Sequence, residues 1–296
     1  MRFELLEPQS IEEAVSHLSE LRDESRVIAG GQSLLLMIRS GLVRPRVLVS
    51  LGALGDLSKL ELSPEGTLTV GALATHRQIW KSQPVREKAH IVAQAVSQIG
   101  STPVRNFGTI GGNVCHNEMG SDPPPALLVL DAKAECVSSR GRRKISLSDF
   151  LTGFFETCLE PDEILVGLEI PPAPPQSKGV YLKHTLRSGD LAIVGVAALL
   201  EVRDGFCREA RLALGGVGPV PFRAREAENA LRQSPVTDSA IEEAASAAAA
   251  MSDPISDAHA SADYRKKMVR VFVKRAIRQA MEGRPSPIPS PWQGEG

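Results

Sequence analysis

The sequence is poor in aromatic residues and has no excess of charge of either sign. Phe, Trp and Tyr make up 4% of the 296 residues, and 34 Lys and Arg residues nearly balance 35 Asp and Glu residues. The basic residues are scattered, so we expect no nucleic-acid partner. No apolar run approaches the roughly 20 residues of a membrane helix, and the start lacks the apolar segment of a signal peptide. We therefore expect a cytoplasmic protein without a membrane span.

Cysteines are few, and none of them form a recognisable ligand motif. Cys115, Cys136, Cys158 and Cys207 include no C-x-x-C pair of the kind that holds zinc or an iron–sulfur cluster. The sequence also lacks H-E-x-x-H, G-x-G-x-x-G and G-x-x-x-x-G-K-[ST], which excludes the usual zinc-protease, Rossmann and P-loop motifs. We expect four reduced thiols and no metal in this chain. Any metal cluster would belong to another chain.

Two short segments each place two glycines together. The first, AGGQSLLL at residues 29–36, follows a predicted strand at 26–29 and leads into a predicted short helix at 33–40. A further apolar run at 47–49 completes a small βαβ-like unit. The second segment, TIGGN at 109–113, lies in a predicted loop.

A glycine pair after a strand has a possible chemical use. It allows positive φ and brings bare backbone N–H groups near a ligand, and the N-terminus of a following helix favours negative charge. Together these features favour an anion such as a pyrophosphate. Ser33 would either cap the helix or donate its hydroxyl to a phosphate oxygen. Either glycine pair taken alone is more often a tight turn. The residues by themselves therefore indicate only an α/β protein that binds an anion.

The remaining patterns predict further helices and strands. Ser10–Glu13 and Thr75–Gln78 are capping boxes that start helices, and a helical apolar pattern runs to Gly100. Alternation at 164–170 predicts a strand with one buried face, and the proline-rich stretch at 171–179 predicts a linker. The elements predicted beyond the linker are a hairpin turn at Asp204-Gly205 and helices at 224–231, 239–251 and 262–281.

Six sequence segments, taken in order, resemble those of a known family. They are AGGQSLL with RPRVLVSL, VRNFGTIGGNVCH, Asp122 with PPALLVLDA, DEILVGLEIP, YLKHTLRSGDLAIVG and ASADYRKKMVRVFVKRAI, which span about residues 3–280. In this order they are similar to the FAD-binding medium subunit of molybdenum hydroxylases. This is the family of the carbon monoxide dehydrogenase medium chain and the flavin domain of xanthine dehydrogenase. The cysteine-rich insert of its hydroxybenzoyl-CoA reductase branch is absent.

The resemblance implies an α+β fold. A two-subdomain α/β clasp of the vanillyl-alcohol-oxidase or PCMH type would hold FAD, and an α+β C-terminal domain with an antiparallel sheet and helices would follow. The pyrophosphate would lie between the two subdomains, which would explain why each supplies one glycine segment. The implied divisions are FAD-binding subdomains at 1–56 and 57–172 and a C-terminal flavoprotein domain at 173–285. The Pro- and Gly-rich composition of the end of the chain predicts a disordered tail at 286–296.

The resemblance also assigns residues to the FAD site. Backbone N–H groups of the first glycine segment would bind the pyrophosphate with Ser33 as a side-chain donor, and the second segment would form the opposite wall. Lys183 would place a cation near the flavin, where it stabilises the anionic reduced form. No catalytic residue and no metal ligand is assigned. The implied FAD-binding residues are Ala29, Gly30, Gly31, Gln32, Ser33, Leu34, Leu35, Leu36, Ile99, Thr109, Ile110, Gly111, Gly112, Asn113, Asp122, Leu165 and Lys183.

Some of these residues have an alternative structural interpretation. Asp122 precedes three prolines and would equally cap a helix, Leu165 would be a core residue, and Lys183 would be a solvated strand lysine. Ile99 stands where relatives often have an aromatic residue. Three loop residues that depart from the family pattern would either tune the flavin environment or only line the loop: Cys115, His116 and Glu118.

The implied function is electron transfer within a multi-subunit oxidoreductase. This chain would carry FAD, a large partner the molybdenum cofactor and a small partner the [2Fe–2S] clusters, in a heterotrimer or its dimer. NAD, a quinone or dioxygen would be the final acceptor. Two alternatives stay open: a self-contained flavin oxidase of the vanillyl-alcohol-oxidase class, and a non-enzymatic nucleotide-binding module.

Overall fold

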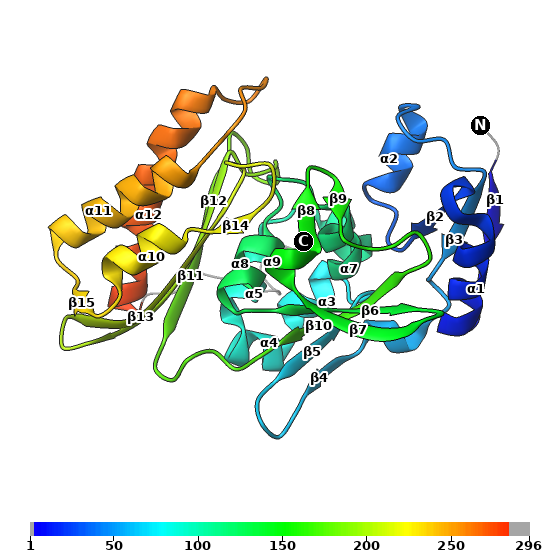
Figure 1. The fold of residues 1–296 in the computed structure, drawn as a ribbon, viewed down its shortest axis with the longest axis horizontal. Coiled ribbons are helices and arrows are strands. Elements are labelled where there is room, and N and C mark those ends of the chain that lie inside the picture. The colour runs from blue at the N-terminus through cyan, green and yellow to red at the C-terminus, as the bar shows by residue number, and fades with distance from the viewer. Residues whose placement is uncertain (1–2, 284–296) are drawn as a thin grey trace.

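The computed structural model describes residues 3–283 and arranges them in three parts along the long axis of the molecule (Figure 1). The tail expected to be disordered at 286–296 lies outside the described residues. The first part holds a parallel sheet in the order β1-β3-β2. Its elements are β1 (Glu4–Leu6), α1 (Ile11–Leu21), η1 (Arg22–Glu24), β2 (Ser25–Ile28), α2 (Leu34–Arg39), β3 (Val47–Ser50) and η2 (Gly55–Ser58).

The first part contains the βαβ-like unit that the sequence predicts. Strands β2 and β3 are parallel neighbours, and α2 connects them before Gly41, at φ 76°, turns the chain. At the start of α1 the Ser10 hydroxyl accepts a hydrogen bond from the Glu13 backbone N–H, which is the predicted cap. The Glu13 carboxylate accepts from the backbone N–H of Gln9 and not from that of Ser10, so the reciprocal bond of the predicted capping box is shifted by one residue.

The second part is an antiparallel sheet in the order β4-β5-β10-β6-β7, with helices packed against it (Figure 1). Its strands are β4 (Leu60–Leu62), β5 (Leu68–Gly71), β6 (Lys133–Ser138), β7 (Gly141–Ser146) and β10 (Ile164–Ile170), with the hairpin β8 (Leu151–Gly153) and β9 (Glu156–Thr157). Its helices are α3 (His76–Lys81), α4 (Gln83–Lys88), α5 (His90–Ser97), α6 (Thr102–Phe107), α7 (Ile110–His116), α8 (Pro123–Val129) and α9 (Leu147–Phe150).

The helical pattern predicted from Thr75 to Gly100 is divided into three helices. Thr75 and Gln78 form the predicted capping box at the start of α3. The chain breaks at Ser82, whose hydroxyl accepts from a backbone N–H of the next turn and so caps α4. A second break precedes α5, which ends before Gly100 turns the chain at φ 44°.

Strand β10 is buried on both faces, not on one as the alternation predicts. The pairing of β10 with β6 shifts register between Leu165 and Gly167. Ile164 and Val166 consequently pack in the core shared with α1 and β3, whereas Leu168 packs in the core of the second part. An irregularity of one residue moves side chains to the opposite face of a strand.

The third part is an antiparallel sheet in the order β11-β12-β13-β14, with helices α10 to α12 against it (Figure 1). Asp204 and Gly205 have φ of 50° and 74°, as the predicted two-residue hairpin between β12 and β13 requires. The elements are β11 (Lys178–His184), β12 (Val194–Arg203), β13 (Phe206–Gly215), β14 (Phe222–Arg223), α10 (Arg225–Leu231), β15 (Ser234–Pro235), α11 (Asp238–Met251) and α12 (Ala262–Glu282).

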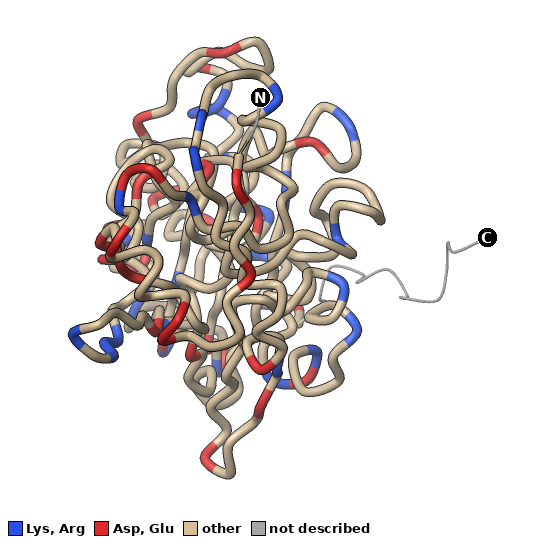
Figure 2. Tube along the Cα trace, turned by 90° about the vertical axis from the view of Figure 1, so that its right-hand side faces the viewer, with Lys and Arg blue, Asp and Glu red and all other residues tan. Residues whose placement is uncertain are grey.

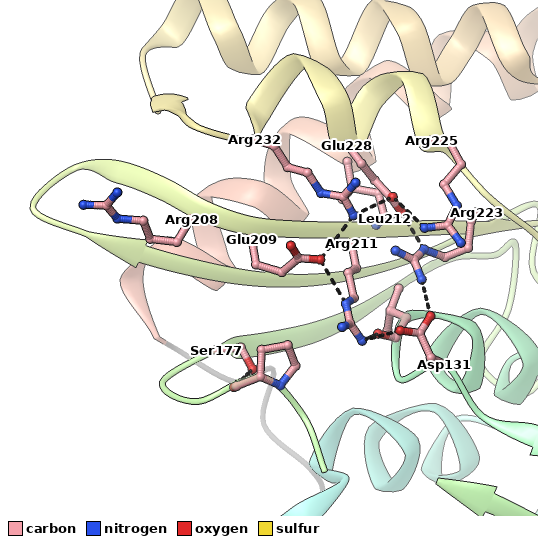
Figure 3. A network of polar contacts seen from close by, with 12 residues as sticks. Asp131, Ser177, Arg208, Glu209, Arg211, Leu212, Arg223, Arg225, Glu228 and Arg232 are labelled. Atoms are coloured by element: carbon pink, nitrogen blue, oxygen red, sulfur yellow. Dashed lines mark hydrogen bonds and ion pairs between the residues drawn. The ribbon is translucent and has the colours of Figure 1, made fainter. Parts of the chain in front are cut away.

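Helix α8 is buried between the second and third parts. At its C-terminal end Arg223 donates to the Leu128 carbonyl and Arg211 to the Val129 carbonyl, each at 3.2 Å. Both guanidinium groups also bind the Asp131 carboxylate at 2.8 Å (Figure 3). Cations are favourable here because the last carbonyls of a helix lack intrahelical partners and carry partial negative charge.

Charged residues of both signs are interspersed along the trace (Figure 2). No helix in the described part of the chain has both the length and the apolar character needed to cross a membrane. Within residues 3–283 no three His, Cys, Asp or Glu side chains are grouped as metal ligands.

Candidate cofactor-binding site

The first glycine segment is an open turn between β2 and α2. Gly31 has φ 70°, a value that side-chain-bearing residues rarely adopt, and its carbonyl accepts from the Leu35 N–H at 3.2 Å. Within residues 3–283 the backbone N–H groups of Gly30, Gly31, Gln32 and Ser33 have no backbone acceptor. The Ser33 hydroxyl precedes α2 without capping it. The segment thus holds four successive N–H groups without backbone acceptors beside a hydroxyl that does not cap the helix.

The second glycine segment is the start of helix α7, not the predicted loop. The Thr109 hydroxyl caps the helix by accepting from the Gly112 N–H at 3.1 Å. The N–H groups of Ile110 and Gly111 donate to the carbonyls of Ala74 and Ala72, each at 2.9 Å. Neither glycine of this segment has positive φ. Most backbone N–H groups of this segment already donate to other groups of the protein, so few of them remain as donors for a ligand.

The structure brings the two glycine segments together although they belong to different parts. A Cβ atom on Gly30 would overlap the carbonyl oxygen of Phe107, just before the second segment, and one on Gly112 would lie 4.0 Å from the Ala29 Cβ. Only a residue without a side chain fits at Gly30. The first part and the second part therefore meet along their glycine-containing turns.

Asp122 and Lys183 form a buried ion pair between the second and third parts. Lys183 Nζ lies 2.8 Å from Asp122 Oδ2, and the two side chains are 3% and 4% exposed. Tyr181 donates its hydroxyl to the other carboxylate oxygen at 2.7 Å, and Lys183 also donates to the Gln98 carbonyl at 3.2 Å. Asp122 makes no helix-cap bond, and Lys183 is not a solvated strand lysine.

Burial shifts the pKa values around this ion pair, and the bonds of the pair use part of the donor capacity of Lys183. Burial raises the pKa of the Asp122 carboxyl while Lys183 opposes that change, and burial together with the Asp122 charge raises the pKa of Tyr181 well above its usual value. Tyr181 therefore keeps its proton at neutral pH. An ammonium group has three N–H donors, and the bonds to Asp122 and Gln98 use two of those on Lys183.

The other residues assigned from the resemblance occupy different environments. Leu165 is 4% exposed and packs in the core of the second part, as the alternative interpretation of this residue as a core residue expects. Ile99 is half-buried against the same core. Leu34 is half-buried, whereas Leu35 and Leu36 are 40% and 63% exposed.

The three loop residues that depart from the family pattern end or follow α7. Burial raises the pKa of the Cys115 thiol to about 12, which keeps it protonated and unreactive. The His116 ring stacks against Phe155 with centroids 4.8 Å apart, and burial lowers the pKa of His116. Burial raises the pKa of Glu118, whose carboxylate accepts from the Gly120 N–H.

Sequence reasoning missed three side chains that organise this region. Tyr181 binds Asp122, Arg105 binds the carbonyls of Ile99 and Gly100, and His76 lies buried beside Gly108. The signals were present: Tyr181 alternates with Lys183 along β11, and Arg105 belongs to the VRNFGTIGGN motif. Their partners are distant in the sequence, which hid the contacts.

Comparison with known proteins agrees with this arrangement. Residues 1–173 match the family model described as the FAD binding domain in molybdopterin dehydrogenase, and residues 180–280 match the CO dehydrogenase flavoprotein C-terminal domain. The chain therefore belongs to the FAD-binding medium subunits of molybdenum hydroxylases and is a subunit of an oxidoreductase. FAD is the cofactor of this family, and the molybdenum and iron–sulfur groups belong to other subunits.

Individual relatives match over nearly their whole length. The chain is 33% identical to the 6-hydroxypseudooxynicotine dehydrogenase complex subunit alpha of Paenarthrobacter nicotinovorans, over 94% of each chain. It is also 33% identical to the carbon monoxide dehydrogenase medium chain of Afipia carboxidovorans, over 94% of this chain and 96% of that one. A structure of carbon monoxide dehydrogenase from Hydrogenophaga pseudoflava has a TM-score of 0.93 at 31% identity, covering 96% of this chain and 98% of that chain.

Proposed function

We propose that this chain carries FAD as the electron-transfer subunit of a molybdenum hydroxylase. It would take electrons from [2Fe–2S] clusters of a small partner and pass them to NAD, a quinone or dioxygen. A large partner would hold the molybdenum cofactor and oxidise the organic substrate. The observation that carries the proposal is the pair of touching glycine segments, one of which presents four free N–H groups, in a chain that belongs to this family.

The residues of the first glycine segment fit the pyrophosphate of FAD. Consecutive N–H groups around a glycine of positive φ form a concave donor site for an anion. Gly31 supplies the positive φ, Gly30 lets the second part approach the segment, and the Ser33 hydroxyl would supply one further donor. Thr109, Ile110, Gly111, Gly112 and Asn113 would form the facing wall, since a side chain at Gly30 would collide with the backbone that leads into it.

Lys183, Asp122 and Ile99 would hold the remainder of the cofactor. When bound, FAD supplies the ability to accept electrons singly and release them in pairs. Lys183 has one N–H donor left, and Asp122 and Gln98 fix its ammonium group in place, so it would present a fixed positive charge. Leu165 would contribute through the packed core beneath the site.

The assembly follows from the relatives. Two of them are named as a medium chain or as a subunit of a complex, and they match this chain over nearly their full length. This supports a heterotrimer, or its dimer, over a self-contained flavin oxidase or a non-enzymatic nucleotide-binding module. The cysteines are all free thiols, which supports a reducing, cytoplasmic location for the complex.

The test is the visible absorption spectrum of the purified chain, before and after incubation with FAD and removal of the excess. Nucleotide released on denaturation is identified by mass, and co-purifying subunits are analysed for molybdenum and iron. We expect flavin bands, released FAD and both metals in the co-purifying chains. A folded chain that retains no FAD with its partners present would refute the proposal. Turnover of an organic substrate by the isolated chain would favour the self-contained oxidase.

A further inference from the structure

Three successive carbonyls at the end of α5 are each bound by a side-chain cation. The Gln98 carbonyl accepts from Lys183 at 3.2 Å, and the carbonyls of Ile99 and Gly100 accept from Arg105 Nη1 at 2.7 and 2.9 Å. Carbonyls at a helix C-terminus lack intrahelical partners and carry partial negative charge, so both cations are favourable here. The turn at Ile99–Gly100, whose first residue is assigned to FAD, is thus fixed by Arg105.

The Arg105 guanidinium is itself fixed in place. Its Nη2 donates to the Thr102 hydroxyl at 3.3 Å, and its Cζ lies 5.6 Å from the centroid of the Trp80 ring on α3. Arg77 of α3 donates to the side chain of Asn106 at 3.0 Å, which anchors the next residue of α6 to the same helix. The planar guanidinium binds the two carbonyls through Nη1 and the Thr102 hydroxyl through Nη2 while its carbon lies over the indole ring.

The far end of α6 leads to both glycine segments. Gly30 of the first segment packs against the Phe107 carbonyl so closely that no side chain fits between them. The Gly108 carbonyl accepts from the backbone N–H of His76, and the next residue, Thr109, caps α7. Helix α6 therefore touches all three segments of the proposed site, and Arg105 lies at its centre.

We propose that Arg105 is a positioning residue that sets the distance between the Ile99–Gly100 turn and the two glycine segments, so that the FAD site is formed before FAD binds. This inference rests on the proposed function. Arg105 acts through backbone groups and is not assigned a contact with FAD. Removing it frees two carbonyls and lets the turn move relative to the glycine segments, which lowers the affinity for FAD and alters the surroundings of the bound flavin.

The experiment compares Arg105→Met, Arg105→Lys and the matched control Arg77→Met in the full chain purified with its accompanying subunits. FAD affinity is measured by titration of each apo form, the visible band shape is recorded with FAD bound, and unfolding midpoints are recorded without FAD. We expect Arg105→Met to raise the Kd for FAD about tenfold or more, the factor of one charge-assisted hydrogen bond, and to shift the flavin bands. Arg105→Lys recovers part of the affinity because an ammonium group can still bind a carbonyl.

The control separates positioning of the turn from anchoring of α6. Arg77→Met loosens α6 without freeing the two carbonyls. We expect its Kd for FAD to stay within about twofold of wild type, a free-energy change much smaller than that of one hydrogen bond. The inference would be overturned by a folded Arg105→Met chain that binds FAD with wild-type affinity and has wild-type flavin bands. It would also be overturned if Arg77→Met weakened FAD binding as much as Arg105→Met. If Arg105→Met does not fold, a wild-type Kd for Arg105→Lys overturns it. A wild-type chain that binds no FAD refutes the proposed function instead.

Discussion

The two glycine segments at residues 29–36 and 109–113 share one use of glycine and differ in another. In the first, Gly30 allows close approach of the Phe107 carbonyl, Gly31 needs positive φ, and four N–H groups are left without backbone acceptors. In the second, the backbone is helical, and Gly111 is needed because a Cβ there would lie 2.7 Å from the Ala72 carbonyl oxygen. Close packing of backbones is thus common to both segments, whereas only the first combines it with positive φ and a run of N–H groups without backbone acceptors. A double glycine by itself therefore does not indicate whether backbone donors are left unused.

The second segment is also tied to the third part of the molecule. The Asn113 side chain accepts from the Ser121 hydroxyl at 2.8 Å, and the next residue is Asp122 of the buried ion pair with Lys183. No titratable side chain occurs in residues 29–36, so the first segment has no tie of this kind. The predictions below test whether the first segment affects mainly ligand binding and the second mainly stability.

The largest expected effect is that of Lys183→Met. It leaves the Asp122 carboxylate buried without its cation, and breaking a buried pair in this way lowers the free energy of unfolding by about 3–5 kcal/mol. Denaturant unfolding of the chain without FAD measures the loss. The double variant with Asp122→Asn removes the stranded charge and should recover much of it. A single variant as stable as wild type would show that the pair does not hold the second and third parts together.

The next largest effects on stability are expected from glycine-to-alanine substitutions, one in each segment. Gly111→Ala forces a Cβ against Ala72 and should lower the free energy of unfolding by about 3 kcal/mol, the upper end for over-packing. Gly31→Ala meets only side-chain atoms, of Leu35 and Ile28, and should lose about 1–2 kcal/mol through its positive φ. For each kcal/mol of stability lost, Gly31→Ala should reduce FAD retention more than Gly111→Ala does.

The control for this pair is Gly66→Ala, which changes a positive-φ glycine in the turn between β4 and β5, where an added Cβ would make only an ordinary contact with Pro172 at 3.7 Å. It should lose similar stability to Gly31→Ala and keep FAD. Equal FAD loss from Gly66→Ala and Gly31→Ala would mean that the first segment is only a turn.

Acid should weaken the region of the second segment through His76. This side chain is 3% exposed beside Gly108, its Nδ1 has no partner, and burial and the Arg105 charge lower its pKa from 6.5 to about 4. Because the folded pKa is the lower one, the unfolded chain binds more protons between these values. Stability is complete above pH 6.5 and is lost as the pH falls towards 4, by up to roughly 3 kcal/mol.

The measurement for His76 is the free energy of unfolding at pH 7, 5.5 and 4, for wild type and for His76→Gln, which has no charge to gain. The two pH profiles should diverge below pH 6.5, with wild type losing more. Parallel profiles would show that His76 does not contribute to the acid sensitivity. Other groups titrate in both chains and cancel in the difference.

The sequence was sufficient for features whose cause is local. The caps at Ser10 and Thr75, the hairpin at Asp204-Gly205 and the βαβ-like unit around Gly31 follow from short-range patterns, and the structure contains each of them. The resemblance correctly gave the family and the fold.

Features that depend on distant residues were not predictable. The two-sided burial of β10 arises because α1 and β3 cover one face and the core of the second part covers the other, and the helical start of the second glycine segment depends on bonds to Ala72 and Ala74. The pairing of Asp122 with Lys183 joins residues far apart in the chain. Neither the spacing nor the composition near any of these residues contains that information.

The smallest expected effect concerns the hydroxyls that precede the two helices. Thr109 caps α7 by accepting from the Gly112 N–H, so Thr109→Ala should lower the free energy of unfolding by about 1 kcal/mol. Ser33 precedes α2 without capping it, so Ser33→Ala should leave stability unchanged and weaken FAD binding by about the worth of one hydrogen bond, roughly tenfold in Kd. Unfolding curves without FAD and FAD titrations of both variants measure the contrast. If Ser33→Ala lowered stability as Thr109→Ala does, the hydroxyl of the first segment would serve the helix, as that of the second does, and the difference between the two segments would reduce to their glycines.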